Sequence, residues 1–129
     1  MDFLKHLKPL SGAAEWPIWK KKIRDLLDYH ENTLDVIDGK LVKPERIAAD
    51  APEEEIRKYK KSKEAFRKAN SYAKSVIASS VIDGVYQKIM DQETAREAWK
   101  GLRHLFEATS KDQLFQVCTE LISLSWNPV

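Results

Sequence analysis

Apolar residues recur at helical spacing near the start of this chain. Over residues 15–30 they fall three and four positions apart, which places them on one face of an α-helix. Pro17 suits the first turn of such a helix, where a backbone N–H has no helical partner to lose. The pattern predicts a first helix over residues 15–30, with an apolar face made of Trp16, Trp19, Ile23, Leu26 and Leu27.

The next two predicted elements differ in length. Leu34, Val36 and Ile37 form a short apolar stretch that Gly39 ends, and we expect a short helical or extended turn there. A long helix is expected to begin near Pro52, with Asp50 as its cap and three glutamates in the first turn, where the helix dipole favours negative charge. Its inward-facing residues are predicted to be Ile56, Tyr59, Phe66, Ala69, Ala73, Val76 and Ile77.

Two further helix starts carry a recognisable capping pattern. Thr94 and Glu97, and later Ser110 and Gln113, have the spacing of a capping box, in which each side chain binds a free backbone N–H of the other residue. Between the long helix and Thr94 the pattern breaks, and Gly84 allows a bend. We therefore predict an all-α, compact bundle of four to six helices. Its core is predicted to contain Trp16, Trp19, Ile23, Leu27, Phe66, Ile77, Trp99, Leu102, Phe106 and Leu121.

Length and composition fit one soluble domain. The chain has 129 residues, of which 43% are hydrophobic and 33% are charged. We expect an extended lead-in over residues 1–14, a helical domain over 15–125 and a short tail over 126–129. There is no apolar run of about 18 residues and no signal-peptide pattern, so we expect a cytoplasmic protein without membrane contact.

Charge gives one candidate binding patch. The 22 basic and 20 acidic residues nearly cancel, leaving a formal net charge of +2, which provides no long-range attraction for nucleic acid. Lys20, Lys21, Lys22 and Arg24 are nevertheless clustered near two tryptophans that could stack on bases, and they are candidate RNA contacts. The alternative is an ordinary solvated face, because a helix spreads consecutive residues around its axis.

Residues that carry chemistry are sparse and scattered. His6, His30 and His104 lie far apart in the sequence, and the single cysteine, Cys118, falls on a predicted apolar face. No glycine-rich phosphate-binding or nucleophile motif occurs. We therefore expect no catalytic residues, no metal, no cofactor and no small-molecule substrate: the protein is predicted not to be an enzyme.

Several segments together resemble a known family. They are Trp16–Leu27, Val36–Gly39, Phe66–Ser80, Thr94–Ser110 and Leu114–Leu124, and they resemble the Gag proteins of copia-type LTR retrotransposons. The similarity runs over roughly positions 9–124, with the motifs in the order found in that family. Each motif alone is weakly specific, because each consists mostly of a helix cap and packing residues, but their order and spacing together are more specific.

The resemblance implies a structural role. Gag subunits assemble into a shell around the RNA of the element, and this region would be the N-terminal part of a retroviral-type capsid, packing side by side through helix faces. The matched positions would be scaffold residues: Trp16, Trp19, Ile23, Leu27, Gly39, Phe66, Ala73, Ile77, Thr94, Ala95, Trp99, Leu102, Phe106, Glu107, Leu114 and Leu121. Because tyrosine and tryptophan concentrate at interfaces, the candidate assembly contacts are Tyr29, Tyr59, Tyr72, Tyr86 and Trp126, of which Tyr59 could instead belong to the core.

The sequence departs from the family at its C-terminal end. Full-length relatives continue into a second capsid region and commonly a Cys/His knuckle that grips RNA, and neither pattern is present here. The chain would then be an excised piece, or a naturally shortened and domesticated Gag. Three functions follow as hypotheses: self-association in virus-like particles, co-assembly that inhibits a longer Gag, and weak RNA binding through Lys20–Arg24 and Lys58–Lys68.

Overall fold

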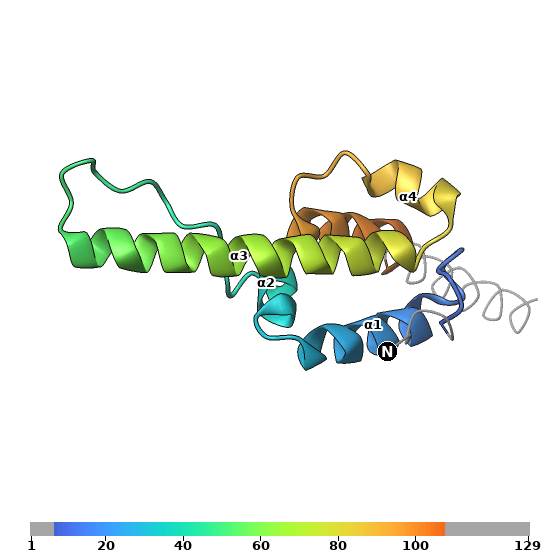
Figure 1. Ribbon diagram of the computed structural model, residues 1–129. Coiled ribbons are helices and arrows are strands. Elements are labelled where there is room, and N and C mark those ends of the chain that lie inside the picture. Colours follow the sequence, from blue (N-terminus) through green and yellow to red (C-terminus); the bar gives the residue numbers. More distant parts are fainter. Residues whose placement is uncertain (1–6, 108–129) are drawn as a thin grey trace, which may run out of the picture.

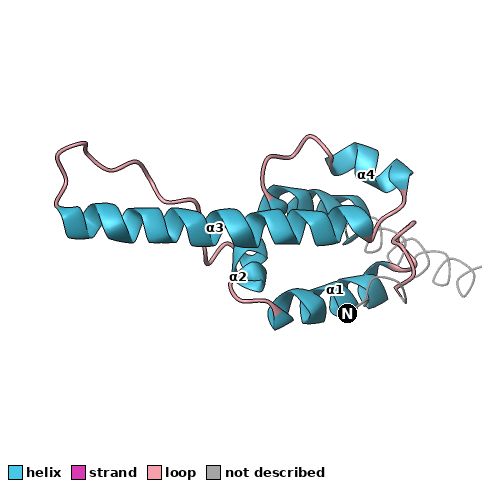
Figure 2. Ribbon diagram, in the orientation of Figure 1, coloured by secondary structure: helices cyan, strands magenta, loops and turns pink. Residues whose placement is uncertain are grey.

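The computed structural model describes residues 7–107, and in this range the protein is all-helical (Figures 1 and 2). The labelled helices are α1 (Trp16–Tyr29), α2 (Thr33–Asp38), α3 (Glu53–Ser79) and α4 (Asp83–Ile89), and a fifth helix covers residues 95–107. Across the described range the only β-type pairing is an isolated bridge between Leu10 and Val81. The predicted all-α bundle is confirmed.

The bundle is organised along α3, its longest helix. Figure 1 shows α1, α4 and the helix of residues 95–107 gathered at the C-terminal half of α3, with α2 near its middle. The N-terminal half of α3 extends beyond the other helices, next to the long loop that joins it to α2. Accordingly, the buried residues of α3 all lie in its second half: Ala69, Ala73, Val76 and Ile77.

This arrangement corrects two expectations about α3. The predicted inward-facing positions Ile56 and Tyr59 are only partly buried, because no other helix covers the first half of α3. Asp50 is not the cap: the N-cap position is Pro52, which makes no side-chain cap hydrogen bond. The fixed φ of proline starts the helix at Glu53, so the carboxylate of Asp50 stands outside the cap position.

Three tryptophans form the centre of the core. The ring centroids of Trp16, Trp19 and Trp99 lie 5.6 to 5.7 Å apart, in the range for aromatic pairs that attract one another. The ring of Phe106 lies 6.1 Å from that of Trp16. This cluster fixes α1 against the helix of residues 95–107.

The polar edge of one tryptophan ties the cluster to the end of α3. Nε1 of Trp19 donates a buried hydrogen bond of 2.8 Å to the carbonyl oxygen of Ser80. The same oxygen accepts the backbone N–H of Leu10 at 2.9 Å, and Leu10 in turn accepts the N–H of Ile82 at 3.1 Å. Leu10 is fully buried, so the segment before α1 is anchored to the bundle by both backbone and side chain.

The other core residues predicted from periodicity are placed as follows. Ile23, Leu27, Ile77 and Leu102 are buried, and Phe66 and Phe106 are partly buried against the core. Leu121 and the predicted Ser110 cap lie outside the described residues. The apolar faces of the described helices therefore meet in one shared core.

The start of the helix of residues 95–107 is held by two side chains. Oγ1 of Thr94 accepts the backbone N–H of Glu97 at 3.2 Å, which is one half of the predicted capping box. Oδ1 of Asn70, from α3, accepts the N–H of Ala95 at 2.8 Å. The amide of Asn70 thereby satisfies a free helix N–H and joins two helices at the same time.

Candidate functional site

The predicted basic cluster of α1 is divided by the fold. Lys20 and Arg24 line a pocket that faces the helix of residues 95–107. Lys21 and Lys22 are exposed, and Lys21 pairs with Asp25 at 3.1 Å. The helix thus separates the four candidate RNA contacts, and only two of them share a pocket.

That pocket, which we call the basic pocket, has a volume of about 300 Å³. Three further basic residues line it, Arg96, Lys100 and Arg103, all from the helix of residues 95–107. Asp38 supplies one carboxylate, and the buried side chains of Ile37 and Trp99 supply the apolar lining. The residues that line it are Lys20, Arg24, Ile37, Asp38, Arg96, Trp99, Lys100 and Arg103.

The side of this pocket formed by the helix of residues 95–107 was not predicted from the sequence. Arg96, Lys100 and Arg103 are spaced four and three residues apart, so they share one face of a helix. That spacing was readable from the sequence. The apolar residues of the helix of residues 95–107 predict its buried face, but nothing in the sequence indicates that its basic face meets α1.

Two carboxylates partly neutralise the pocket. Arg24 donates two hydrogen bonds to Asp38, at 2.9 and 3.1 Å, and this bonding lowers the pKa of the Asp38 carboxyl and raises that of the guanidinium. Glu107 accepts hydrogen bonds from Lys20 at 3.5 Å and Arg103 at 3.4 Å. Burial by itself raises the pKa of Glu107, but the positive charges of Lys20 and Arg103 outweigh it and leave the pKa lowered.

The Arg24–Asp38 pair predicts a pH-dependent contribution to stability. Because the pKa of Asp38 is lower in the folded protein than in the unfolded chain, the pair stabilises the fold above the unfolded pKa, and this is lost as pH falls through the folded value. We expect Asp38→Asn to cost about 0.5–1 kcal/mol at pH 7, since solvent still screens the pair, and less at pH 3. Urea denaturation of both proteins at the two pH values measures the difference. If the difference in free energy of unfolding between parent and variant is not smaller at pH 3 than at pH 7, the Arg24–Asp38 pair is not the source of this stability.

The predicted interface tyrosines occupy different environments. Tyr29 is 70% exposed and Tyr86 is 38% exposed. Tyr72 is partly buried against the core, and burial raises its pKa. Trp126 lies outside the described residues.

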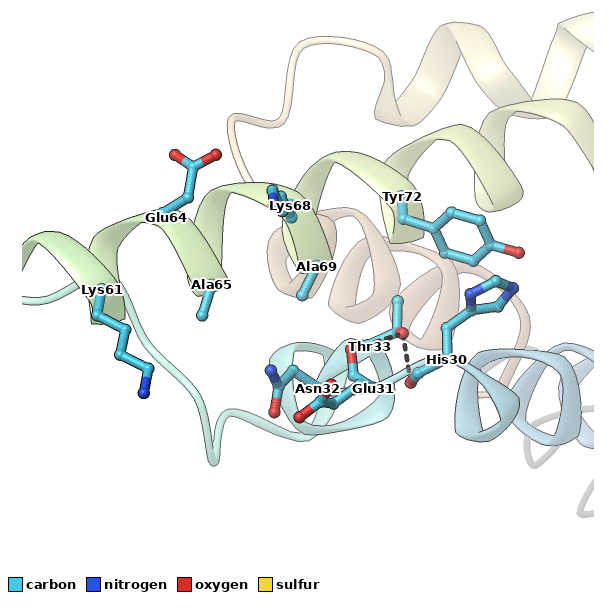
Figure 3. A pocket seen from close by; sticks show the side chains of 10 residues that line it. All are labelled: His30, Glu31, Asn32, Thr33, Lys61, Glu64, Ala65, Lys68, Ala69 and Tyr72. Carbon is cyan, nitrogen blue, oxygen red and sulfur yellow. Dashed lines mark hydrogen bonds between the residues drawn. The ribbon is translucent and has the colours of Figure 1, made fainter.

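Tyr72 and His30 line an open groove between α3 and the α1–α2 turn. Figure 3 shows the two rings pointing toward one another, and their centroids are 4.0 Å apart. Beneath them, Oγ1 of the buried Thr33 donates a 2.7 Å hydrogen bond to the carbonyl oxygen of His30. This hydrogen bond between Thr33 and His30 stabilises the turn between α1 and α2.

Exposed apolar side chains gather on α4. Tyr86 lies within α4, and the N-cap residue Ile82 and the C-cap residue Met90 each lie four positions away from it. They are 42%, 38% and 52% exposed, respectively. Tyr86 and Met90 also border a groove of about 280 Å³ between α3 and α4. We call these three residues the α4 apolar stripe.

The described range offers little for metal or membrane chemistry. Within residues 7–107, no three histidine, aspartate or glutamate side chains are grouped so that they could hold a metal ion. None of the helices in that range is both long and apolar enough to cross a membrane. Cys118 and His6 lie outside it.

The described residues form a helical domain in which Trp16, Trp19 and Trp99 pack in the core. Its accessible features include an apolar stripe, an open groove and a basic pocket. Comparison with protein families gives a match over residues 23–128 to the gag-polypeptide of LTR copia-type, and the chain belongs to this family. The family is structural rather than catalytic, and no enzyme family is indicated. Neither the curated proteins nor the solved structures give a significant match.

Proposed function

We propose that this chain is a structural Gag domain that self-associates through helix faces during retrotransposon particle assembly. The observation that carries the proposal is the α4 apolar stripe, in a chain that belongs to a structural Gag family. Leaving three large apolar side chains in water is unfavourable by about 25 cal/mol for each Å² that a partner could cover. A second copy of the chain that covers them would recover this free energy.

The size of the stripe suits assembly rather than a permanent dimer. Tyr86 and the two cap residues of a seven-residue helix form a small contact, below the roughly 1,000 Å² expected of a stable specific interface. A particle repeats each contact many times, and the repetition compensates for the weakness of one contact. The proposed association is therefore weak in dilute solution and rises steeply with concentration.

Substitutions on the stripe test this proposal. We expect the parent protein to increase in mean mass with concentration in light scattering, and the double variant Tyr86→Ser/Met90→Glu to remain monomeric. Both positions are exposed enough to accept polar side chains without unfolding the bundle. Thermal melting monitored by circular dichroism verifies the fold of each variant.

A matched control uses an exposed apolar residue elsewhere. Val42, in the loop between α2 and α3, is 57% exposed, and Val42→Glu is expected to associate like the parent. A parent that stays monomeric at every concentration overturns the proposal. Association that is unchanged in the α4 double variant overturns the assignment of the interface to the α4 apolar stripe.

A further inference from the structure

The basic pocket carries more positive charge than its own carboxylates neutralise. Five cationic side chains reach it, and only the carboxylates of Asp38 and Glu107 are paired with them, which leaves a local charge of about +3. The whole chain has a formal net charge of +2. The excess of positive charge is therefore concentrated at the basic pocket and is not spread over the whole surface.

The pairing within the pocket is uneven. Arg24 is held by Asp38, while Lys20 and Arg103 share Glu107. Among the described residues, Arg96 and Lys100 have no carboxylate partner and no side-chain hydrogen bond. Two donors from adjacent turns of one helix are thus available to an incoming anion.

Gly39 leaves room for the side chain of Arg96. The guanidinium of Arg96 lies directly against the backbone of Gly39, at a place where any Cβ would collide with it. The guanidinium thus lies at the end of α2, in the pocket that Ile37 and Trp99 also line. Because apolar side chains lower the local dielectric constant, a negative charge bound here would interact more strongly with these cations than it would at an open surface.

We propose that the basic pocket binds phosphate groups. Each phosphate offers several oxygen acceptors, and near neutral pH a terminal phosphate carries close to two negative charges while a backbone or internal phosphate carries one. Guanidinium groups bind such oxygens in a bidentate geometry. A volume of about 300 Å³ lies at the lower limit of small-molecule sites, which suits a compact polyphosphate or two neighbouring phosphates of a nucleic acid backbone. The shared chemistry is the phosphate, and its source is decided by experiment.

The other basic stretches of the molecule are less suited to this role. Lys21 and Lys22 lie on the exposed side of α1, where no pocket residue joins them. On α3, Lys58 and Arg67 pair with glutamates of the same helix. Within residues 7–107, the basic pocket is the place where cations from α1 and the helix of residues 95–107 surround one cavity.

Titration with tripolyphosphate, and separately with a short single-stranded RNA, tests the proposal. Trp99 lines the pocket, so the tryptophan fluorescence of the protein, to which Trp99 contributes, supplements calorimetry as a readout. We expect saturable binding that weakens with added salt, and a loss of affinity of at least tenfold in the double variant Arg96→Gln/Lys100→Gln. Removing two unpaired cations relieves repulsion, so this variant is expected to fold like the parent, which circular dichroism verifies.

The control removes the same charge from the same molecule. Lys21→Gln/Lys22→Gln lowers the net charge by two at exposed positions outside the pocket, and it is expected to bind within about twofold of the parent. Saturable tripolyphosphate binding identifies free polyphosphate as a sufficient ligand. RNA binding alone, weakened by the pocket variant, identifies backbone phosphates as the source. No binding of either probe, or an equal loss in both double variants, overturns the proposal.

Discussion

Trp99→Ala is expected to lower the free energy of unfolding by about 3–5 kcal/mol, comparable to the whole stability of a small domain. Trp99 is only 3% exposed, and its ring lies 5.7 Å from that of Trp16 and 5.6 Å from that of Trp19. Alanine would leave a large cavity between α1 and the helix of residues 95–107, and would also remove two aromatic pairs worth about 0.5–1.5 kcal/mol each.

Urea denaturation followed by circular dichroism measures this loss. Tyr29→Ala is the control, because it also removes a large aromatic ring but from a position that is 70% exposed. Its free energy of unfolding is expected to change by no more than about 0.5 kcal/mol. If the two variants unfold at the same urea concentration, the three tryptophans are not the centre of the core.

The positions of the helices could be predicted from the sequence because their apolar residues follow one period. Trp16, Trp19 and Ile23 specify the inward face of α1 by spacing alone, and Thr94 marks the start of a helix by its chemistry. In α3 the same reasoning failed at Ile56 and Tyr59. Periodicity says which face of a helix is apolar, but it does not say how far along the helix other elements will cover that face.

The surface features were harder to predict because they depend on distant segments. Lys20 on α1 and Arg103 lie 83 positions apart, and they meet because the tryptophan cluster fixes the angle at which their helices pack. For the segment that contains the α4 apolar stripe, the sequence predicts only a break in the helical pattern and a bend at Gly84. Whether Ile82 and Met90 are exposed depends on how α3 packs beside α4, and the local sequence pattern does not predict this packing.

Substitution of Gly39 is expected to affect both the stability of the fold and the proposed phosphate site. Its φ of +77° lies in the left-handed region, where a residue with a Cβ is disfavoured by about 1–2 kcal/mol. The same Cβ would push away the guanidinium of Arg96, which is the far end of a flexible side chain and can move. Gly39→Ala is therefore expected to destabilise the protein by about 1–2 kcal/mol and to weaken tripolyphosphate binding.

The two effects of Gly39→Ala can be separated by comparison with Arg96→Ala. In the double variant Gly39→Ala/Arg96→Ala, the collision between the Cβ and the guanidinium is absent but the left-handed backbone remains. Most of the loss of about 1–2 kcal/mol in the free energy of unfolding should therefore persist, as measured by urea denaturation.

Gly84→Ala is the matched control. Gly84 lies within α4, an added Cβ meets nothing within 4 Å, and alanine favours helix by up to about 1 kcal/mol. Opposite signs are thus expected for the same substitution at two glycines, because one ends a helix in a left-handed turn and the other lies inside a helix. Equal stability of Gly39→Ala and the parent would mean that the turn after α2 does not hold Gly39 in this conformation, and the positioning of Arg96 would lose its basis.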